Sequence, residues 1–289
     1  MPPSRVTAVL QVIGAAALWG ISGVVARSLF QRAVDPVHLV QVRMMLGGLA
    51  LLPLAVRGGM GVAPRWLALL PPYAVALAAV QLTYFEAVAA AGVAVAVFLQ
   101  YTSPLLVAGF EAARDRRLPP RPVLLSLGAA TAGSALLVLP GGALRVPAGG
   151  LAWGIASAFS MAAGTILAGS AQRRGARPLP LLSLGLALGS LLFWPVRTPW
   201  AALASVSPGD WPFFLFIGLF ATAVPFGLYV AALGRLRGSV VNLVAMLEPA
   251  LAGALAWIAL GESLTRGQVA GAALILAGVA LAVAGSRRG

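Results

Sequence analysis

The chain alternates between apolar runs of about twenty residues and short segments that carry arginine, proline or glycine. An apolar run of that length, folded as a helix, crosses the roughly 30 Å hydrocarbon core of a bilayer. The pattern predicts ten transmembrane helices, at approximately residues 7–27, 36–56, 66–90, 93–112, 122–140, 148–171, 178–196, 211–234, 238–260 and 266–285. Residues 66–112 must form two of them, because a single helix rising about 1.5 Å per residue would be too long for one crossing.

The sequence also repeats itself at a shift of 145 residues without a gap. The pairs that match under this shift include Tyr84/Tyr229, Pro104/Pro249, Arg121/Arg266 and Gly133/Gly278. Tyrosine, proline and arginine at one common spacing indicate an internal duplication, with halves at residues 1–144 and 145–289 that together form one membrane domain. Each half would hold five helices, and because five is odd the halves would lie in opposite orientations. Inverted repeats are common in secondary transporters, whose substrate site lies near the bilayer midplane between the repeats.

Composition places the chain among integral membrane proteins of the all-α class. Of the 289 residues, 60% are hydrophobic and 9% are charged, whereas a soluble domain has roughly 25% charged residues. The net charge of +13 comes from arginines in the predicted loops, which does not indicate nucleic-acid binding. These arginines lie mostly on one side, and the positive-inside rule therefore predicts that both termini are cytoplasmic. Without cysteine, the chain has no disulfide, thiolate metal site or cysteine nucleophile.

The stretch at residues 238–262 is long enough to cross the bilayer, yet it carries Glu248 and Pro249 in its middle. A carboxylate at that depth costs roughly 2.5–3.5 kcal/mol on insertion scales, and proline bends the helix. Such residues are tolerated where they face protein or a water-filled cavity. Glu248 is therefore the first candidate to bind a substrate amine or to carry a proton. The structural alternative is a buried glutamate bonded to a neighbouring helix.

Other polar and aromatic residues on the predicted helices are candidates to line the same cavity and bind substrate. They are Trp19, Gln81, Tyr84, Gln100, Tyr101, Tyr229 and Asn242. Aromatic walls beside a carboxylate suit a ligand with an amine, through cation–π attraction of about 0.5–2 kcal/mol per ring. The alternative for the tyrosines is the aromatic belt at the membrane surface.

Arg43 lies well inside a predicted helix. It could form an outer gate or clamp a substrate carboxylate, pair with Glu86, or extend to the outer headgroups. Glu86 is a second candidate for proton coupling, although it points roughly 200° away from Tyr84 around the helix. His38, the single histidine, is expected to be a solvated loop residue.

Four stretches resemble the drug/metabolite transporter superfamily, in particular bacterial ten-helix members built from two EamA-type halves. They are AALWGISGVVAR (16–27), VQVRMMLGGLALLPLA (40–55), YTSPLLVAGFEAARDRRL (101–118) and LVAMLEPALAGALAWIALGESLTRGQVAGAALILAGVAL (243–281). The resemblance implies alternating-access transport of small metabolites or drugs in a bacterial cytoplasmic (inner) membrane, often outward and proton-coupled. It also implies that Trp19 lies on the cavity wall, and it does not fix the substrate.

The sequence therefore predicts a secondary active transporter, most simply for proton-coupled export or exchange of an amino acid or related amine. A quaternary amine or other organic cation is the alternative if Arg43 takes no part. An intramembrane enzyme is a distant alternative, because one histidine and scattered acids supply neither a catalytic pair nor metal ligands. No cofactor or metal is expected. The expected partners are a small-molecule substrate, protons and the lipid bilayer, with the chain as a monomer or homodimer.

Overall fold

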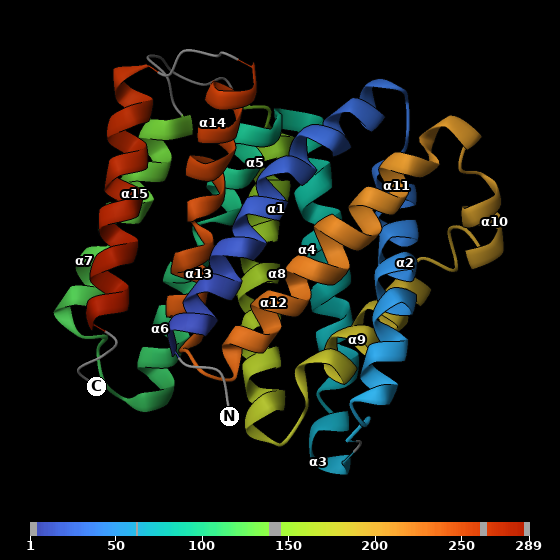
Figure 1. Cartoon of the computed structure of the whole chain (residues 1–289), viewed down its shortest axis with the longest axis horizontal. Coiled ribbons are helices and arrows are strands. Elements are labelled where there is room, and N and C mark those ends of the chain that lie inside the picture. Colours follow the sequence, from blue (N-terminus) through green and yellow to red (C-terminus); the bar gives the residue numbers. More distant parts are fainter. Residues whose placement is uncertain (1–4, 62, 139–145, 261–264, 286–289) are drawn as a thin grey trace.

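The structure is a computed structural model that describes residues 5–61, 63–138, 146–260 and 265–285, and within these ranges its regular elements are all helical (Figure 1). The elements in the first half of the chain are α1 (Arg5–Gln31), α2 (Pro36–Arg57), α3 (Pro64–Leu67), α4 (Leu70–Ala91), α5 (Val93–Gln100), α6 (Ser103–Asp115) and α7 (Arg121–Val138). Those in the second half are α8 (Ala148–Arg173), α9 (Pro178–Leu191), α10 (Pro199–Ala204), η1 (Pro208–Asp210), α11 (Trp211–Gly218), η2 (Leu219–Ala223), α12 (Val224–Leu233), α13 (Gly238–Ala245), α14 (Leu247–Leu260) and α15 (Arg266–Gly285).

Seven helical stretches among the described residues are long and apolar enough to cross a membrane. They are Arg5–Gln31, Pro36–Arg57, Pro64–Ala91, Val93–Asp115, Ala148–Arg173, Pro208–Leu233 and Arg266–Ala284. Three more apolar helices are shorter, at Arg121–Leu137, Pro178–Leu191 and Gly238–Ala252. All of these stretches overlap predicted spans, so the all-helical membrane class agrees with the sequence. That all ten cross the bilayer stays a prediction, and the predicted boundary at residues 144 and 145 lies outside the described residues.

Two of the apolar segments are interrupted near their middle, where α5 gives way to α6 and α13 gives way to α14. Each interruption lies just before a proline, Pro104 in the first case and Pro249 in the second. Proline has no N–H to donate to the carbonyl four residues earlier, here that of Gln100 or Ala245. At the bend predicted for Pro249 the helix is interrupted for one residue, Met246, and Glu248 lies in the first turn of the helix that follows.

The helices pack largely in pairs, with α4 along α8, α1 along α12, α2 along α9 and α7 along α15. Glycine lets the last pair approach closely. A Cβ added to Gly133 of α7 would lie 2.6 Å from the carbonyl oxygen of Gly271 on α15, and one added to Gly271 would lie 2.6 Å from that of Gly133. Small residues at such contacts are typical of helices packed within membranes.

The start of α1 and the end of α15 lie at the same end of the molecule, the lower one in Figure 1. The ends of α2, α6, α8 and α12 lie there too, as do α3 and the starts of α7, α9 and α13 (Figure 1). These helix ends and their turns carry Arg57, Arg65, Arg114, Arg116, Arg117, Arg121, Arg173, Arg174, Arg177, Arg235 and Arg237. We call this the arginine-rich end; that it faces the cytoplasm stays a prediction.

Candidate functional site

A small cavity lies between α1, α2, α4, α8, α12 and α14, beside the break between α5 and α6. We call it the central cavity. Its lining residues are Trp19, Ser22, Arg43, Val80, Gln81, Tyr84, Gln100, Tyr101, Met161, Phe226 and Glu248. Its volume of about 40 Å³ has room for roughly three water molecules, since one water needs about 10–15 Å³ of such volume. In this conformation the space in the central cavity is thus too small for a metabolite.

Seven of the residues predicted from the sequence meet at this cavity. They are Trp19, Arg43, Gln81, Tyr84, Gln100, Tyr101 and Glu248. They come from five helices and one helix break, so the fold brings together side chains up to 229 residues apart, the separation of Trp19 and Glu248.

Glu248 faces the cavity, and its residue is 5% exposed. The hydroxyl of Tyr101 donates a hydrogen bond of 2.6 Å to its Oε2 atom. Tyr101 lies in the break that precedes Pro104, and Glu248 directly precedes Pro249, so the two proline breaks meet at this bond. The structure therefore has features of both alternatives considered for Glu248. Its carboxyl group is hydrogen-bonded to a neighbouring helix, and it also borders the central cavity.

Arg43 is buried, with 3% of the residue exposed. Its Nε donates to Thr222 Oγ1 at 2.7 Å, and its Nη2 donates to the carbonyl of Ala221 at 2.9 Å. The guanidinium carbon lies 4.7 Å from the centre of the Phe85 ring. Extension to the headgroups is therefore wrong, because the guanidinium is held inside the protein. The predicted ion pair with Glu86 is also not formed within the described residues.

The acceptor for Arg43 is created by an irregular turn. Residues Leu219–Ala223 form a π-helical turn directly before α12. In a regular helix the carbonyl of Ala221 would accept from the N–H of residue 225, but that residue is Pro225 and has no N–H. The carbonyl of Ala221 therefore lacks its usual helical donor. A buried carbonyl needs a donor, and Arg43 supplies it. Such π-helical turns occur frequently at functional sites.

Arg43 and Glu248 border the same cavity without neutralising each other. No nitrogen–oxygen distance of 4.0 Å or less joins these two described side chains. The Nη1 atom of Arg43 has no hydrogen-bond partner in the described part of the chain. A guanidinium and a carboxyl group separated across one cavity can hold the opposite charges of a zwitterion.

Four further polar atoms at the cavity are buried and have no hydrogen-bond partner among the described residues. They are Trp19 Nε1, Gln81 Nε2, Gln81 Oε1 and the Tyr84 hydroxyl oxygen. Leaving one such group unpaired costs about 1–3 kcal/mol, and buried polar groups in native proteins are usually paired with protein, water or ligand. Four such atoms around one cavity indicate a binding site for water or a polar ligand.

Tyr229 and Asn242 are not brought to the central cavity. The Tyr229 hydroxyl donates to Asn242 Oδ1 at 2.5 Å and lies 2.7 Å from Thr165 Oγ1, while Asn242 Nδ2 lies 3.3 Å from that same Thr165 oxygen. These bonds join α12, α13 and α8. The Tyr229 ring lies 5.6 Å from that of Trp19, so this polar cluster supports the cavity wall from behind.

Glu86 and His38 also lie elsewhere. Glu86 is half-buried and does not line the central cavity, as the helical angle from Tyr84 predicts. The expectation that His38 is solvated is wrong, because it is 8% exposed. Its Nε2 atom lies 2.8 Å from the carbonyl oxygen of Ala202 and 3.2 Å from Ser205 Oγ. The segment around α10 covers the start of α2, which no local pattern around His38 predicts.

Ser22, Val80, Met161 and Phe226 line the cavity but were missed in the sequence. Ser22 follows Trp19 by three positions and therefore shares its helix face, a signal that was available. Phe226 lies behind Trp19, with ring centres 5.0 Å apart. Nothing in the sequence distinguishes Met161 from other apolar residues. In the part of the chain that is described, no cluster of three or more histidine, aspartate or glutamate side chains could hold a metal ion.

Comparison with known proteins gives one family and several relatives. The model of the EamA-like transporter family matches residues 6–139 and again residues 148–284. The chain is 28% identical over 288 residues to an uncharacterized inner membrane transporter, YicL, of Salmonella typhimurium, covering 96% of each chain. It is 29% identical to an uncharacterized transporter of Archaeoglobus fulgidus, covering 88% of this chain and 90% of the relative. It is also 26% identical to the uncharacterized transporter YwfM of Bacillus subtilis, covering 96% of this chain and 94% of that one.

One solved crystal structure has the same fold. It matches with a TM-score of 0.79 and 21% identity, and the match covers 99% of each chain. At this identity the likeness concerns the fold alone. The family match confirms the EamA-type resemblance of the four stretches, while the count of ten helices stays a prediction.

Proposed function

Because the chain belongs to the EamA-like transporter family, a family of membrane transporters, we propose that it carries a small zwitterionic metabolite, an amino acid or a related amine, through the central cavity. The observation that carries this proposal is the pair Arg43 and Glu248, a guanidinium and a carboxyl group that border one cavity but form no ion pair with each other. A substrate carboxylate would bind the free side of Arg43, and its ammonium group would bind Glu248.

The unpaired polar atoms at the cavity supply the remaining contacts. Gln81, Tyr84 and Trp19 each have buried donors without a partner among the described residues. The faces of Trp19 and Tyr84 add cation–π attraction for an ammonium group. Because about 40 Å³ does not hold an amino acid, the substrate would enter only after helices around the cavity move apart.

The proposed movement is alternating access of two inverted five-helix halves. Support comes from the packing. Under the 145-residue shift α1 corresponds to α8, and α12 corresponds to residues 79–88 of α4. The packed pair α1 and α12 in one place therefore corresponds to the packed pair α8 and α4 in the other. The same shift relates α7 to α15, which pack against each other. Gly133 of α7 packs on Gly271 of α15, and its counterpart Gly278 packs on Ser126, the counterpart of Gly271. Exchanged partners of this kind are expected for a duplicated transporter.

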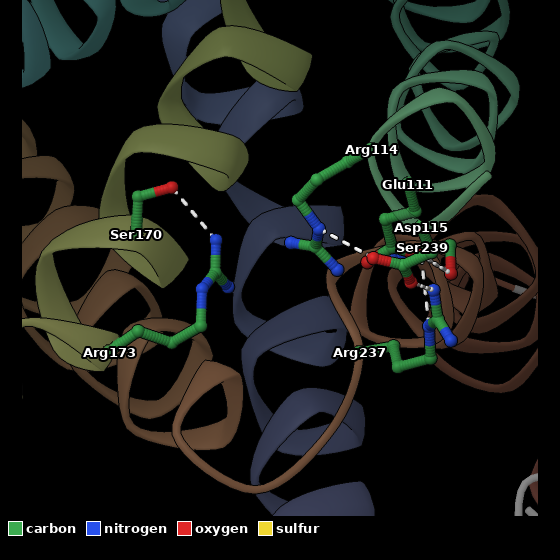
Figure 2. Close-up of polar contacts among 7 residues, drawn as sticks. All are labelled: Glu111, Arg114, Asp115, Ser170, Arg173, Arg237 and Ser239. Carbon is green, nitrogen blue, oxygen red and sulfur yellow. Dashed lines mark hydrogen bonds and ion pairs between the residues drawn. The ribbon is translucent and has the colours of Figure 1, made fainter.

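In this conformation a polar cluster ties the halves together at the arginine-rich end. Glu111 of α6 accepts hydrogen bonds from the backbone N–H and the hydroxyl of Ser239, at the start of α13 (Figure 2). Arg237 bonds to both Glu111 and Asp115, at 3.4 and 2.5 Å. Opening the cavity toward this end would require these bonds to break, so we assign them the role of an inner gate.

Proton coupling is proposed to act through Glu248. Among the described residues it is the one carboxyl group that lines the central cavity. It would take up a proton when the cavity opens to one side and release it on the other, in exchange for substrate. The motif GxxxxGK[ST] that binds ATP phosphates is absent from the sequence, which leaves an ion or substrate gradient as the energy source.

The test uses the purified chain in liposomes preloaded with unlabelled compound. Radiolabelled amino acids and quaternary amines are offered in parallel, for the native chain and for Arg43→Gln. We expect exchange of an amino acid, and loss of at least tenfold in its apparent affinity in Arg43→Gln, since an arginine–carboxylate bond contributes about 1.5–3 kcal/mol. Exchange of a quaternary amine, unchanged by Arg43→Gln, would favour the organic-cation alternative. Exchange of neither class would contradict the proposal.

A further inference from the structure

A second cavity, separate from the central one, lies at the arginine-rich end between α6, α8 and the turn from α12 to α13. Its volume is about 290 Å³. The charged part of its wall consists of Arg114, Arg173, Arg235, Arg237 and Glu111. We call it the basic cavity.

The charges around the basic cavity are unbalanced. Asp115 lies 2.7 Å from Arg114 Nε and 2.5 Å from Arg237 Nη2, and the buried Glu111 is held by Arg237 and Ser239 (Figure 2). Four arginines, which stay charged at any relevant pH, thus face two carboxylates, and two positive charges are left over.

The excess charge has free hydrogen-bonding capacity. Arg114 and Arg173 extend toward one another across the space in Figure 2. In the described residues, the terminal nitrogens of Arg114 have no hydrogen-bond partner, and Arg173 donates to Ser170 on its own helix at 2.9 Å. Two facing guanidinium groups repel each other, and an anion between them would relieve the repulsion.

Much of the remaining wall is apolar, and it reaches the outer surface. Val107, Phe110 and Ile166 line the cavity beside the arginines, and Phe110 is 41% exposed. Arg114 precedes the last residue of α6, and Arg173 is the last residue of α8. If these helices cross the bilayer, the arginines lie at the level of the headgroups while Phe110, one turn further inside, lies at the level of the acyl chains.

We propose that the basic cavity binds the phosphate of an anionic phospholipid, with Arg114 and Arg173 as the principal ligands and Phe110 against the first part of an acyl chain. Guanidinium groups match phosphate oxygens with paired hydrogen bonds, and basic pockets between transmembrane helices are suited to such headgroups. A soluble phosphate compound would use the same arginines but would gain nothing from the apolar side, which is why the lipid is favoured.

The experiment is native mass spectrometry of the full chain in a neutral detergent, titrated with phosphatidylglycerol, with phosphatidylcholine as the zwitterionic comparison. We expect tight binding of phosphatidylglycerol alone. The double variant Arg114→Gln/Arg173→Gln should weaken it by about 25-fold, since each arginine near an anionic headgroup contributes about fivefold. The matched control is Arg57→Gln/Arg121→Gln, which removes the same charge from the same end at exposed positions outside the cavity.

The single variant Arg173→Gln is a second test that is not expected to unfold the protein, because in the described structure Arg173 donates a side-chain hydrogen bond only within its own helix. It should weaken binding by about fivefold. An equal loss in the Arg57/Arg121 control would show a general effect of charge and overturn the proposal. Equal binding of phosphatidylcholine would overturn it as well. Displacement of the lipid by inorganic phosphate at similar concentration would reassign the basic cavity to a soluble anion.

Discussion

Two buried carboxyl groups, Glu248 at the central cavity and Glu111 at the arginine-rich end, have nearly equal exposure, 5% and 7%. Glu111 accepts hydrogen bonds from the N–H and the hydroxyl of Ser239 and from Arg237. Glu248 accepts a bond from the neutral hydroxyl of Tyr101. The two groups thus share their burial and differ in their partners.

The difference separates the carboxylate that is fixed in the proposed inner gate from the one that is proposed to exchange a proton. A buried charge is stable when a cation and several donors surround it, as around Glu111, and removing the partners then costs much. Glu248 has no cation within 4.0 Å among the described residues, and it faces a polar space. A group with so few fixed partners can exchange a proton or a ligand without disturbing the fold.

The largest effect is expected for Glu248→Gln. The amide keeps the size of the side chain and cannot ionise, so transport driven by a pH gradient should fall to background. Exchange of substrate should continue with weaker apparent affinity, because the amide oxygen can still accept a hydrogen bond from the substrate's ammonium group. Measurement of both modes in liposomes checks this. Glu86→Gln is the matched control, because it removes a half-buried carboxylate of α4 that lies outside the central cavity. Gradient-driven flux that persists in Glu248→Gln would refute the proposed proton role.

A smaller effect is expected for Glu111→Gln, which removes the charge from the inner gate. Because the chain has no cysteine, a single Ser22→Cys change gives a clean label at the central cavity. Its reaction with a membrane-impermeant maleimide from the arginine-rich end should accelerate by about thirtyfold in Glu111→Gln, the equivalent of about 2 kcal/mol for hydrogen bonds to a charged group.

The control for this experiment is Asp210→Asn, which breaks the Arg32–Asp210 ion pair in another part of the molecule. It should leave the labelling rate from the arginine-rich end unchanged. Equal labelling rates of Ser22→Cys with and without Glu111→Gln would mean that the hydrogen bonds of Glu111 do not keep the arginine-rich end closed.

Tyr101→Phe should have a still smaller effect, because it removes one hydrogen bond from Glu248 and keeps the ring. We expect gradient-driven transport to slow by about tenfold, in line with about 1–1.5 kcal/mol for such a bond. Initial rates in liposomes test it, and Tyr73→Phe serves as a control, since Tyr73 is a buried tyrosine that does not line the central cavity. A loss as complete as in Glu248→Gln would show that Tyr101 does more than hold the carboxyl group.

The smallest effect is expected for Ser239→Ala. It removes one donor to Glu111 and leaves the Ser239 backbone N–H and Arg237 in place. The labelling rate of Ser22→Cys should rise by about fivefold, the equivalent of about 1 kcal/mol. A rise as large as that of Glu111→Gln would mean that the hydroxyl carries most of the gate by itself.

Much of the cavity could be predicted because bilayer physics restricts what a span can carry. A carboxylate and a proline inside an apolar run are expensive unless they face a polar space, and this argument identifies Glu248 and leads to Tyr101 beside Pro104. The partners of Arg43 could not be predicted. Thr222 and Ala221 lie 179 and 178 residues away, and a proline that frees a carbonyl does not indicate which donor reaches it.

The sequence by itself determined the membrane class, the positions of the apolar helices, the bend at Pro249, and the side chains whose polarity needs an explanation inside a bilayer. These follow from local quantities, namely hydrophobic length and the missing N–H of proline. The tertiary structure decided which polar groups meet. It turned Tyr229 and Asn242 toward Thr165, covered His38 with the α10 segment, and surrounded Glu111 with donors while leaving Glu248 beside a cavity. Such pairings depend on how helices distant in sequence pack against each other, and hydropathy along the chain carries no record of that packing.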